Sequence, residues 1–352
     1  MLKREIVEDL AILLRGFFAT PVISSLGRLG VLNSMRTSSS FTATDFSNIP
    51  NVKLLADTFR YLARIGLIER VDGSNQEYKC TELGSEVFRR ANSFYVPHSY
   101  FEYMYKYHEM IQSEYSDIHP EVERLENVIG SGITHLRYFP PAISFLKRKV
   151  EFDVLVDIGC GDGHFLSAYL KEVPDKKIIG IDLSEISTER TKENLLKEYP
   201  QLDLTTFCVD ASDVEMWSKE VKKVSGNGKI AIAMWFLIQE ISKSNPQIII
   251  DFLSAVKKKF PDASIVVGEM VRQSEHILLK NSHRSLLPEY LFFHEMSNQG
   301  VLSWPEYKEI LVASGYELVV EKLFDEVSDE DLSIIPSTFV WCLVPKKGVT
   351  NE

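Results

Sequence analysis

The stretch VLVDIGCGDGHFLSAYL, Val154 to Leu170, constrains the fold more than any other part of the chain. A short apolar run leads into a turn with three glycines, Gly159, Gly161 and Gly163, and a helical pattern follows. Glycine permits positive φ and lets the backbone approach a ligand closely. The spacing is G-x-G-x-G and not G-x-x-x-x-G-K-[ST], which argues against a nucleotide P-loop. The pattern predicts a strand, a ligand-binding turn and a helix.

From Glu151 onward, short apolar runs alternate with helical segments. The runs are DVLVDIG, KIIGIDL, DLTTFCVD, KIAIAMWFL and SIVVGEM. Such alternation predicts an α/β domain with a parallel sheet covered by helices on both faces. Two last runs, YELVVEKLFDEV and STFVWCLVPK, predict an antiparallel hairpin that closes the sheet.

Two acidic residues follow strands that we expect to lie beside the glycine turn. Asp182 ends the run IIGID, where a carboxylate suits the two hydroxyls of a ribose. Asp210, followed by Ala211, ends the next strand, where it can accept from an exocyclic amine of adenine. Asp157, just before the turn, would repel a pyrophosphate but can hold an ammonium through water. The ligand expected here is a nucleoside joined to an amino acid.

These motifs together resemble those of class I S-adenosylmethionine-dependent methyltransferases, over roughly residues 153–345. VLVDIGCGDGHFL resembles their first motif, GIDLS their second and CVDASD their adenine-side motif. The resemblance implies a Rossmann-like domain over residues 151–352 with S-adenosylmethionine as cofactor. The cofactor-binding residues expected are Asp157, Gly159, Gly161, Gly163, Asp182, Leu183, Asp210, Ala211 and Trp235.

Residues 1–95 read as helices followed by a small hairpin around Asp72-Gly73, a winged-helix pattern. A winged helix can read DNA, but VKLLADTFRYLARIGLIER has few basic residues and an apolar face. A helical domain ahead of this methyltransferase pattern resembles small-molecule O-methyltransferases, in which it forms an intertwined homodimer. We therefore expect a winged-helix-like dimerisation and lid domain, a helical connector over 96–150 lining the substrate pocket, and a homodimer.

Composition narrows the possible partners. The formal net charge of -11 argues against a nucleic-acid partner, because phosphate binding needs a basic surface. The four cysteines are scattered and suggest neither a disulfide framework nor a cysteine zinc site. No signal peptide and no apolar run near the ~20 residues of a membrane span are recognised. The expectation is a cytoplasmic protein without a membrane partner.

The methyl acceptor is the open question. Small-molecule O-methyltransferases place a catalytic His after the fourth strand, where this chain has AMWFLIQEISKSN with Gln239 and Glu240. Downstream, His294 lies in LLPEYLFFHEM. A His with carboxylates can bind a catalytic zinc or iron, which would chelate a 2-oxo acid and stabilise its enolate.

The arrangement resembles 2-oxo-acid C-methyltransferases, such as the 2-ketoarginine and phenylpyruvate enzymes. That resemblance implies Gln239, Glu240 and His294 as the metal site, with Glu240 and His294 catalytic. Metal-assisted C-methylation of a 2-oxo acid is favoured over O-methylation of a hydroxyl or phenol. The other readings are a cofactor-sensing DNA-binding regulator and a protein methyltransferase. His294 as an ordinary hydrogen-bonded residue and Glu240 as a solvated helix start remain open.

Polar residues of the connector and a downstream loop are the substrate candidates. Either Arg124 or Arg137 is expected to bind a substrate carboxylate through two hydrogen bonds. Asn127, Gln299 and His135 are further candidates for the pocket lining. Each of these residues also suits an ordinary surface or linker position.

Overall fold

The computed structural model describes residues 4–112, 122–281, 287–297, 299–328 and 334–346. The chain divides into two compact units. The first comprises the described residues up to Tyr105 together with Val122–Thr134, and the second comprises the described parts of 106–121 and 135–352. The predicted connector, 96–150, is therefore shared between the two units.

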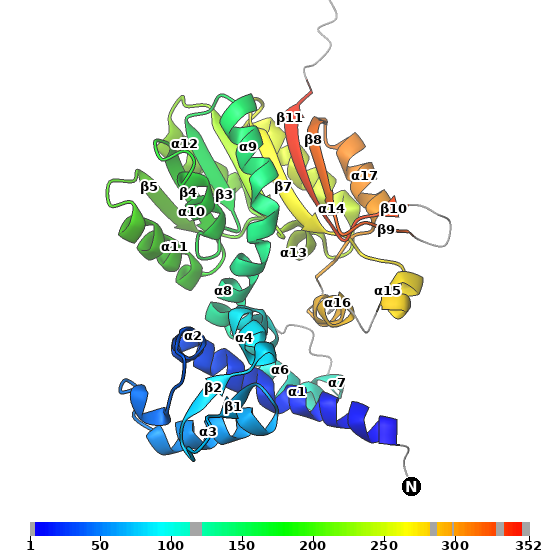
Figure 1. Cartoon of the computed structure of the whole chain (residues 1–352). Coiled ribbons are helices and arrows are strands. Elements are labelled where there is room, and N and C mark those ends of the chain that lie inside the picture. The colour runs from blue at the N-terminus through cyan, green and yellow to red at the C-terminus, as the bar shows by residue number, and fades with distance from the viewer. Residues whose placement is uncertain (1–3, 113–121, 282–286, 298, 329–333, 347–352) are drawn as a thin grey trace, which may run out of the picture. The chain divides into compact units, whose positions relative to one another are not determined.

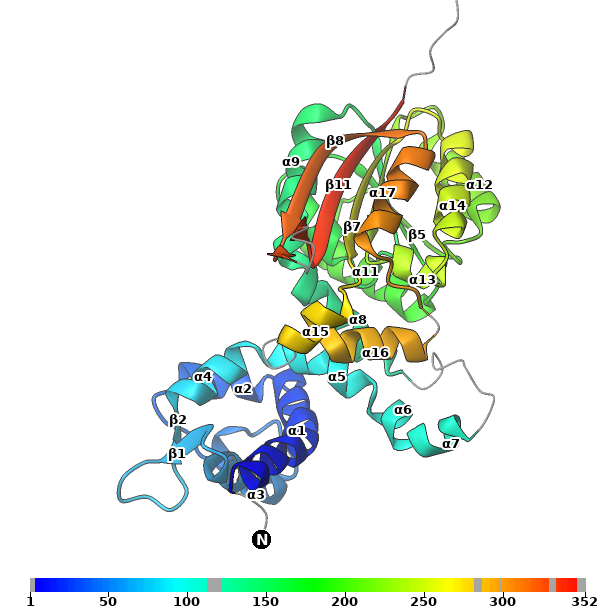
Figure 2. The same ribbon diagram turned by 90° about the vertical axis from the view of Figure 1, so that its right-hand side faces the viewer.

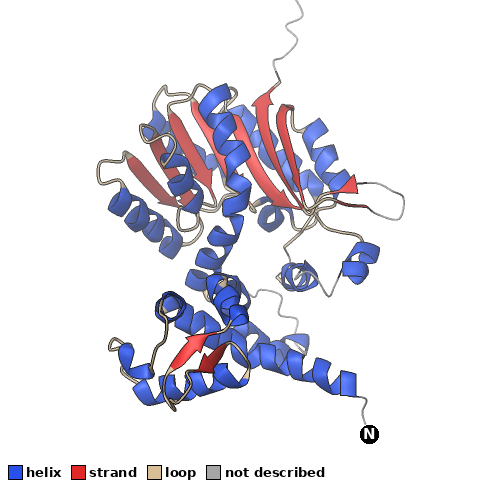
Figure 3. Cartoon of the chain, viewed as in Figure 1, coloured by secondary structure: helices blue, strands red, loops and turns tan. Residues whose placement is uncertain are grey.

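The first unit is mostly helical and contains a two-stranded sheet (Figure 3). Its elements are α1 (Arg4–Arg28), α2 (Val31–Thr37), α3 (Val52–Arg64), β1 (Ile68–Arg70), β2 (Tyr78–Cys80), α4 (Glu82–Arg89), α5 (Tyr95–Ser99), α6 (Phe101–Tyr105) and most of α8 (Arg124–His135). The strands β1 and β2 pair antiparallel, which confirms the predicted hairpin, and Gly73 in its loop has a φ of 80°.

Phe59 on α3 lies at the centre of the first unit's core, fully buried and in edge-on contact with Phe41, Phe46 and Tyr78. Helix α3 begins at Asn51, whose side chain caps it by accepting from the Leu54 amide. The apolar face predicted for this segment is thus buried against the rest of its unit, which orients its polar residues outward.

The second unit is a seven-stranded sheet in the order β5-β4-β3-β6-β7-β11-β8 (Figure 1). Its strands are β3 (Val154–Ile158), β4 (Lys177–Asp182), β5 (Leu204–Cys208), β6 (Ile230–Trp235), β7 (Ser264–Met270), β8 (Tyr316–Phe324) and β11 (Thr338–Pro345). The strands β3 to β7 run parallel, and β11 pairs antiparallel with both β7 and β8. The predicted parallel sheet with a closing antiparallel hairpin is confirmed.

Helices cover both faces of this sheet (Figures 1 and 2). They are α9 (Phe139–Lys149), α10 (His164–Leu170), α11 (Glu185–Glu198), α12 (Val214–Ser225), α14 (Pro246–Lys259) and α17 (Trp304–Ala313). The unit also contains the shorter helices α7 (Tyr107–Ile111), α13 (Ile238–Ser242), α15 (Glu275–Asn281) and α16 (Leu287–Met296), and a separate pair of two-residue strands, β9 (Val327–Ser328) and β10 (Ile334–Ile335). Alternate strand residues point to opposite faces. Val154 and Val156 therefore pack in the core under α12, α14 and α17, while Leu155 packs in the core under α9 and α10.

One helix carries an unusually apolar surface. The segment Leu10–Arg28 of α1 is long and apolar enough to cross a membrane, judged by length and composition alone. This corrects the expectation that no apolar run approaches the length of a membrane span, although core helices of other proteins and signal sequences share this property. Leu13 and Phe17 are 75% and 63% exposed, so this face of α1 lacks cover within the described chain.

Candidate functional site

The glycine turn lies between β3 and α10, and all three of its glycines adopt the left-handed region. Gly159, Gly161 and Gly163 have φ values of 76°, 55° and 86°. A Cβ atom at Gly159 would lie 3.2 Å from the Leu237 side chain. A larger residue would therefore be crowded there, in addition to having an unfavourable φ. The Gly159 amide donates to the Ile181 carbonyl at 2.7 Å, which fastens the turn to β4. Glycine is required here by backbone conformation.

Asp182, at the carboxyl end of β4, joins the turn to the next loop. Its Oδ2 accepts from the Gly161 amide and its Oδ1 from the Ser184 amide, each at 2.9 Å. A carboxylate has room for further donors, so it can also accept from ribose hydroxyls. Leu183 beside it is 68% exposed, which leaves an apolar side chain available to an adenine ring.

Asp210 follows β5, the neighbour of β4. Its Oδ1 accepts from the Ser212 amide at 2.8 Å and from the Ser212 hydroxyl at 2.7 Å. The carbonyl of Ala211 accepts from the Trp217 indole at 3.0 Å, which fixes this loop to α12. The predicted glycines and acids thus follow the carboxyl ends of three adjacent strands, where open α/β sheets bind ligands.

Asp157 is the most unusual acid of the site. It is 1% exposed, and its Oδ1 is buried without a hydrogen-bond partner among the described residues. Burial, and then the charge of Asp182, raise the pKa of Asp157 well above its usual value. An unpaired buried carboxyl is costly. A cationic amine of a ligand would compensate for it, which fits S-adenosylmethionine.

Trp235, the other predicted cofactor residue, ends β6 inside the core. Its ring packs edge-on against Phe139 at 4.7 Å and tilted against Phe165 at 5.0 Å. A Cβ atom at Gly268 on β7 would lie 2.4 Å from the same indole. The structure therefore assigns Trp235 a packing role between α9, α10 and β7, and a cofactor role stays a prediction.

The three predicted metal ligands behave differently from one another. Gln239 and His294 are buried, at 4% and 7% exposure, whereas Glu240 is exposed. Gln239 Oε1, the atom that would bind a metal, accepts from the Tyr290 hydroxyl at 2.7 Å. The Tyr290 ring also lies 4.0 Å from the His294 ring. The structure brings Gln239 and His294 together through Tyr290.

The expected metal site is not supported. Among the described residues, no group of three or more His, Cys, Asp and Glu side chains is arranged to hold a metal ion. His294 Nδ1 donates to the Tyr290 carbonyl at 2.6 Å, which fixes its tautomer. Burial lowers the pKa of His294 to about 4. His294 is thus a neutral, hydrogen-bonded imidazole, and we derive no step through a metal.

Glu269 is a buried acid that the sequence analysis missed. It lies on β7 with no exposed surface, and its Oε2 accepts from the Ile238 amide at 2.9 Å. Its Oε1 accepts from the Met270 amide, also at 2.9 Å. Burial raises the pKa of Glu269 to about 8. Glu269 holds the start of α13, and with it Gln239, against β7. In the sequence, only the presence of an acid in the apolar run SIVVGEM indicates this residue.

A second imidazole lies at the end of α8. The His135 ring stacks on Phe236 with centroids 3.7 Å apart and ring planes 17° apart. Phe236 follows β6 and has a φ of 53°, a conformation rarely adopted by an aromatic residue. Strain of this kind clusters at functional sites. The sequence analysis named His135 only as a possible lining residue.

The other substrate candidates are divided between the two units. Arg124 begins α8, but its side chain lies outside the described residues. Asn127 donates to the Ser99 hydroxyl at 3.3 Å within the first unit. Gln299 belongs to the second unit, where its amide donates to the His294 carbonyl at 2.9 Å. Arg137 is paired with Asp325 at 2.6 Å, so its guanidinium already has a carboxylate partner.

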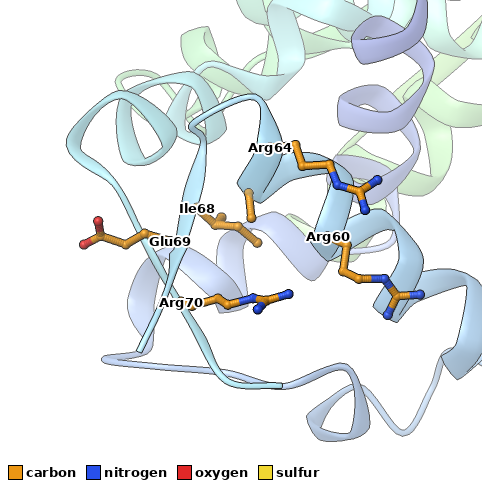
Figure 4. A pocket seen from close by; sticks show the side chains of 6 residues that line it. Arg60, Arg64, Ile68, Glu69 and Arg70 are labelled. Carbon is orange, nitrogen blue, oxygen red and sulfur yellow. The ribbon is translucent and has the colours of Figure 1, made fainter. Parts of the chain in front are cut away.

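The first unit has a cavity of its own, of about 340 Å³. It is lined by Arg60, Ala63, Arg64, Ile68, Glu69 and Arg70 (Figure 4). Arg60 and Arg64 lie one turn apart on α3, and Glu69 points to the opposite side from Arg70. Arg60 is ion-paired with Asp57, and Glu69 with Lys79. The cavity is locally basic in a chain of net charge -11.

Comparisons with known proteins agree with this geometry. Residues 155–240 match a family model described as a methyltransferase domain. A protein-lysine N-methyltransferase of Saccharolobus islandicus (strain REY15A) is 32% identical over 71 residues. That match covers 18% of this chain and 42% of the relative, so the chain spans less than half of the curated relative's length.

Solved structures resemble the chain over nearly its whole length. They include the mitomycin 7-O-methyltransferase MmcR, with a TM-score of 0.62, 13% identity and coverage of 97% of this chain and 98% of that one. An O-methyltransferase family protein from Burkholderia thailandensis matches with a TM-score of 0.61 and 11% identity, over 99% of this chain and 100% of that one. Human N-acetylserotonin methyltransferase in complex with S-adenosylmethionine matches with a TM-score of 0.59 and 13% identity, over 98% of this chain and 99% of that one.

The fold is thus that of class I S-adenosylmethionine-dependent methyltransferases, with the N-terminal helical domain found in O-methyltransferases. More particularly, the second unit contains a methyltransferase domain, matched over residues 155–240, that carries the glycine turn, Asp157, Asp182 and Asp210.

Proposed function

We propose that the protein transfers the methyl group of S-adenosylmethionine to a hydroxyl group of a small molecule. One observation carries the cofactor assignment: the buried, unpaired Asp157 lies next to a glycine turn whose amide is held by Asp182. A ligand with an ammonium group and a ribose satisfies both carboxylates at once.

The cofactor, when bound, supplies an electrophilic methyl group on a sulfonium. The chain's own residues bind and orient it. Asp182 accepts from the ribose hydroxyls, Leu183 contacts the adenine and Asp157 neutralises the amino group. Positioning of this kind turns a bimolecular displacement into an effectively unimolecular one. In this proposal Gln239 and Tyr290 flank the acceptor.

C-methylation of a 2-oxo acid is the second candidate. This reaction would ask least of Gln239, which cannot act as a base, because a bound metal would itself acidify the C–H of a 2-oxo acid and stabilise the enolate. The metal that the sequence analysis attached to this reaction has no supporting ligand group among the described residues. O-methylation is preferred because it requires no such group.

A DNA-reading regulator is the remaining alternative, and the cavity lined by Arg60, Arg64 and Arg70 is the observation that favours it. Phosphate binding would make affinity fall steeply with salt. The absence of duplex DNA binding at low salt would support the small-molecule proposal.

The test is a mass-spectrometric assay with S-adenosylmethionine and a panel of acceptors. The panel contains phenols, catechols, aliphatic alcohols, 2-oxo acids and a lysine peptide, each with added zinc or iron and with chelator. A gain of one methyl group on a hydroxyl compound, indifferent to chelator, supports the proposal. A gain only on 2-oxo acids, lost with chelator, overturns it in favour of the metal-assisted reaction.

A further inference from the structure

His135 lies at the junction of two elements that border the cofactor site. Its ring stacks on Phe236, directly after β6, and its pKa is lowered in part by His164, the first residue of α10. β3 is hydrogen-bonded to β4 on one side and to β6 on the other. This is the point where the strand order reverses and where α/β sheets bind their ligands.

The ring nitrogens of His135 make no hydrogen bond to any of the residues that the structure describes. Burial, and then the neighbouring His164, lower the pKa of His135 to about 3. His164 is itself hydrogen-bonded to Asp162. A neutral imidazole always keeps one nitrogen with a free lone pair. His135 therefore offers an acceptor throughout the physiological pH range.

We propose that His135 is a catalytic residue that accepts the proton of the acceptor hydroxyl during methyl transfer. This inference rests on the proposed function and deepens it. The resemblance to small-molecule O-methyltransferases implies an imidazole after the fourth strand, where this chain has Gln239 and Glu240. The His135 ring, at the end of α8, stacks on Phe236 directly after that strand.

The acceptor oxygen forms a bond to the methyl carbon, and the bond from that carbon to sulfur breaks, leaving its electron pair on a neutral thioether. The hydroxyl proton passes to His135 and then to water. The methylated oxygen, before it loses its proton, is a far stronger acid than an imidazolium, so a weak base is sufficient.

The low basicity of His135 also suits the cofactor. A protonated imidazole beside a sulfonium would place two positive charges together, which costs free energy in a partly desolvated site. A neutral imidazole avoids this repulsion and still accepts the proton once the positive charge has moved to the acceptor oxygen.

The experiment compares His135→Gln and His135→Phe with the wild type and with His108→Gln, a control at an exposed histidine. Histidine rings are labelled with ¹³C, and the His135 signal is identified by its loss in the variants. S-adenosylmethionine and S-adenosylhomocysteine are the probes, and the turnover assay uses the hydroxyl acceptor found in the panel.

The expected result is a His135 signal that stays in the neutral form from pH 5 to 8 and shifts when S-adenosylmethionine is added. Both His135 variants should lose about 10²-fold in kcat, while the Kd for S-adenosylmethionine stays within about twofold. His108→Gln should resemble the wild type in both measurements.

Two results would overturn the inference. One is a His135 signal that does not respond to either probe, a test that needs no acceptor. The other is an unchanged kcat in His135→Gln, or a loss of kcat matched by an equal loss of cofactor affinity. If the wild type methylates nothing in the panel, the proposed function fails, while the spectroscopic test still decides whether His135 lies at the cofactor site.

Discussion

Glu269 Oε2 accepts a hydrogen bond from the Ile238 amide at 2.9 Å, across 31 positions of the sequence. This bond ties the carboxyl end of β7 to the start of α13. It also explains how a buried carboxyl is retained in an apolar strand, since three backbone amides, those of Ile238, Gln239 and Met270, point at it.

The same carboxyl should make stability depend on pH. Its pKa is about 8 in the folded chain and near 4.5 when unfolded, so the folded state binds the proton more tightly. Its contribution is fully present below the unfolded pKa and is lost as pH rises toward 8. The free energy of unfolding of the wild type should therefore fall more steeply between pH 5 and 8 than that of Glu269→Gln. Equal slopes in urea titrations would contradict this assignment.

Asp182→Asn should weaken cofactor binding. The substitution keeps one acceptor oxygen but replaces the other with a donor that faces the Gly161 or Ser184 amide. Charge-assisted hydrogen bonds contribute about 1.5–3 kcal/mol, so the Kd for S-adenosylmethionine, measured by calorimetry, should rise about 10- to 100-fold. Asp203→Asn, at an exposed ion pair with Lys177, is the control and should bind normally. Unchanged affinity in Asp182→Asn would remove the ribose role.

Gly268→Ala should destabilise the second unit. The new Cβ would lie 2.4 Å from the Trp235 indole, which is held between Phe139 and Phe165. Overpacking of this kind costs about 1–3 kcal/mol, visible as a lower midpoint in urea. Gly16→Ala, in helix α1, is the control: a Cβ there meets nothing within 4 Å and alanine favours a helix, so the midpoint should not fall. A midpoint equal to that of the wild type would mean that the indole can shift freely.

Glu126 organises the first unit through three side-chain contacts. Its buried carboxylate accepts from Ser24 at 2.9 Å and Arg28 at 2.8 Å, and it is 2.6 Å from His98. Glu126→Gln should lower the free energy of unfolding by about 1–3 kcal/mol. The effect is limited because Arg28 is partly exposed and solvent weakens its ion pair. Glu86→Gln, at an exposed ion pair with Arg89, should leave stability unchanged. Loss of activity without loss of stability in Glu126→Gln would contradict this structural role.

The exposed apolar face of α1 should mediate self-association. Leu13, Leu14 and Phe17 are all more than half exposed, which is unusual for a monomer's surface. We expect a homodimer by light scattering, converted to monomer by Leu13→Lys combined with Phe17→Lys. Lys53→Glu, on the polar face of α3, is the control and should remain dimeric. A wild-type mass equal to that of one chain would exclude the homodimer.

The parts predicted correctly from sequence depend on local patterns. The glycine turn, Asp182 and Asp210 follow strands recognisable by their apolar runs, and the sheet order then brings them together. The missed parts depend on contacts between distant residues. Tyr290 reaches Gln239 across 51 positions, and His135 reaches Phe236 from a different helix. No local pattern distinguishes such residues from surface or core positions, which is why Glu269 was not predicted. The metal site was expected from a resemblance to 2-oxo-acid C-methyltransferases, which does not fix the contacts of Gln239 and His294.

The order of the strands has a consequence for the evolution of specificity. Apart from Trp235 on β6, the predicted cofactor contacts lie at the carboxyl ends of β3, β4 and β5. Phe236, in contrast, follows β6, Gln239 lies on α13, and Tyr290 and His294 lie on α16. Substitutions in the latter group leave the cofactor half of the sheet intact. The acceptor can therefore change through successive substitutions, each of which leaves the predicted cofactor contacts unchanged.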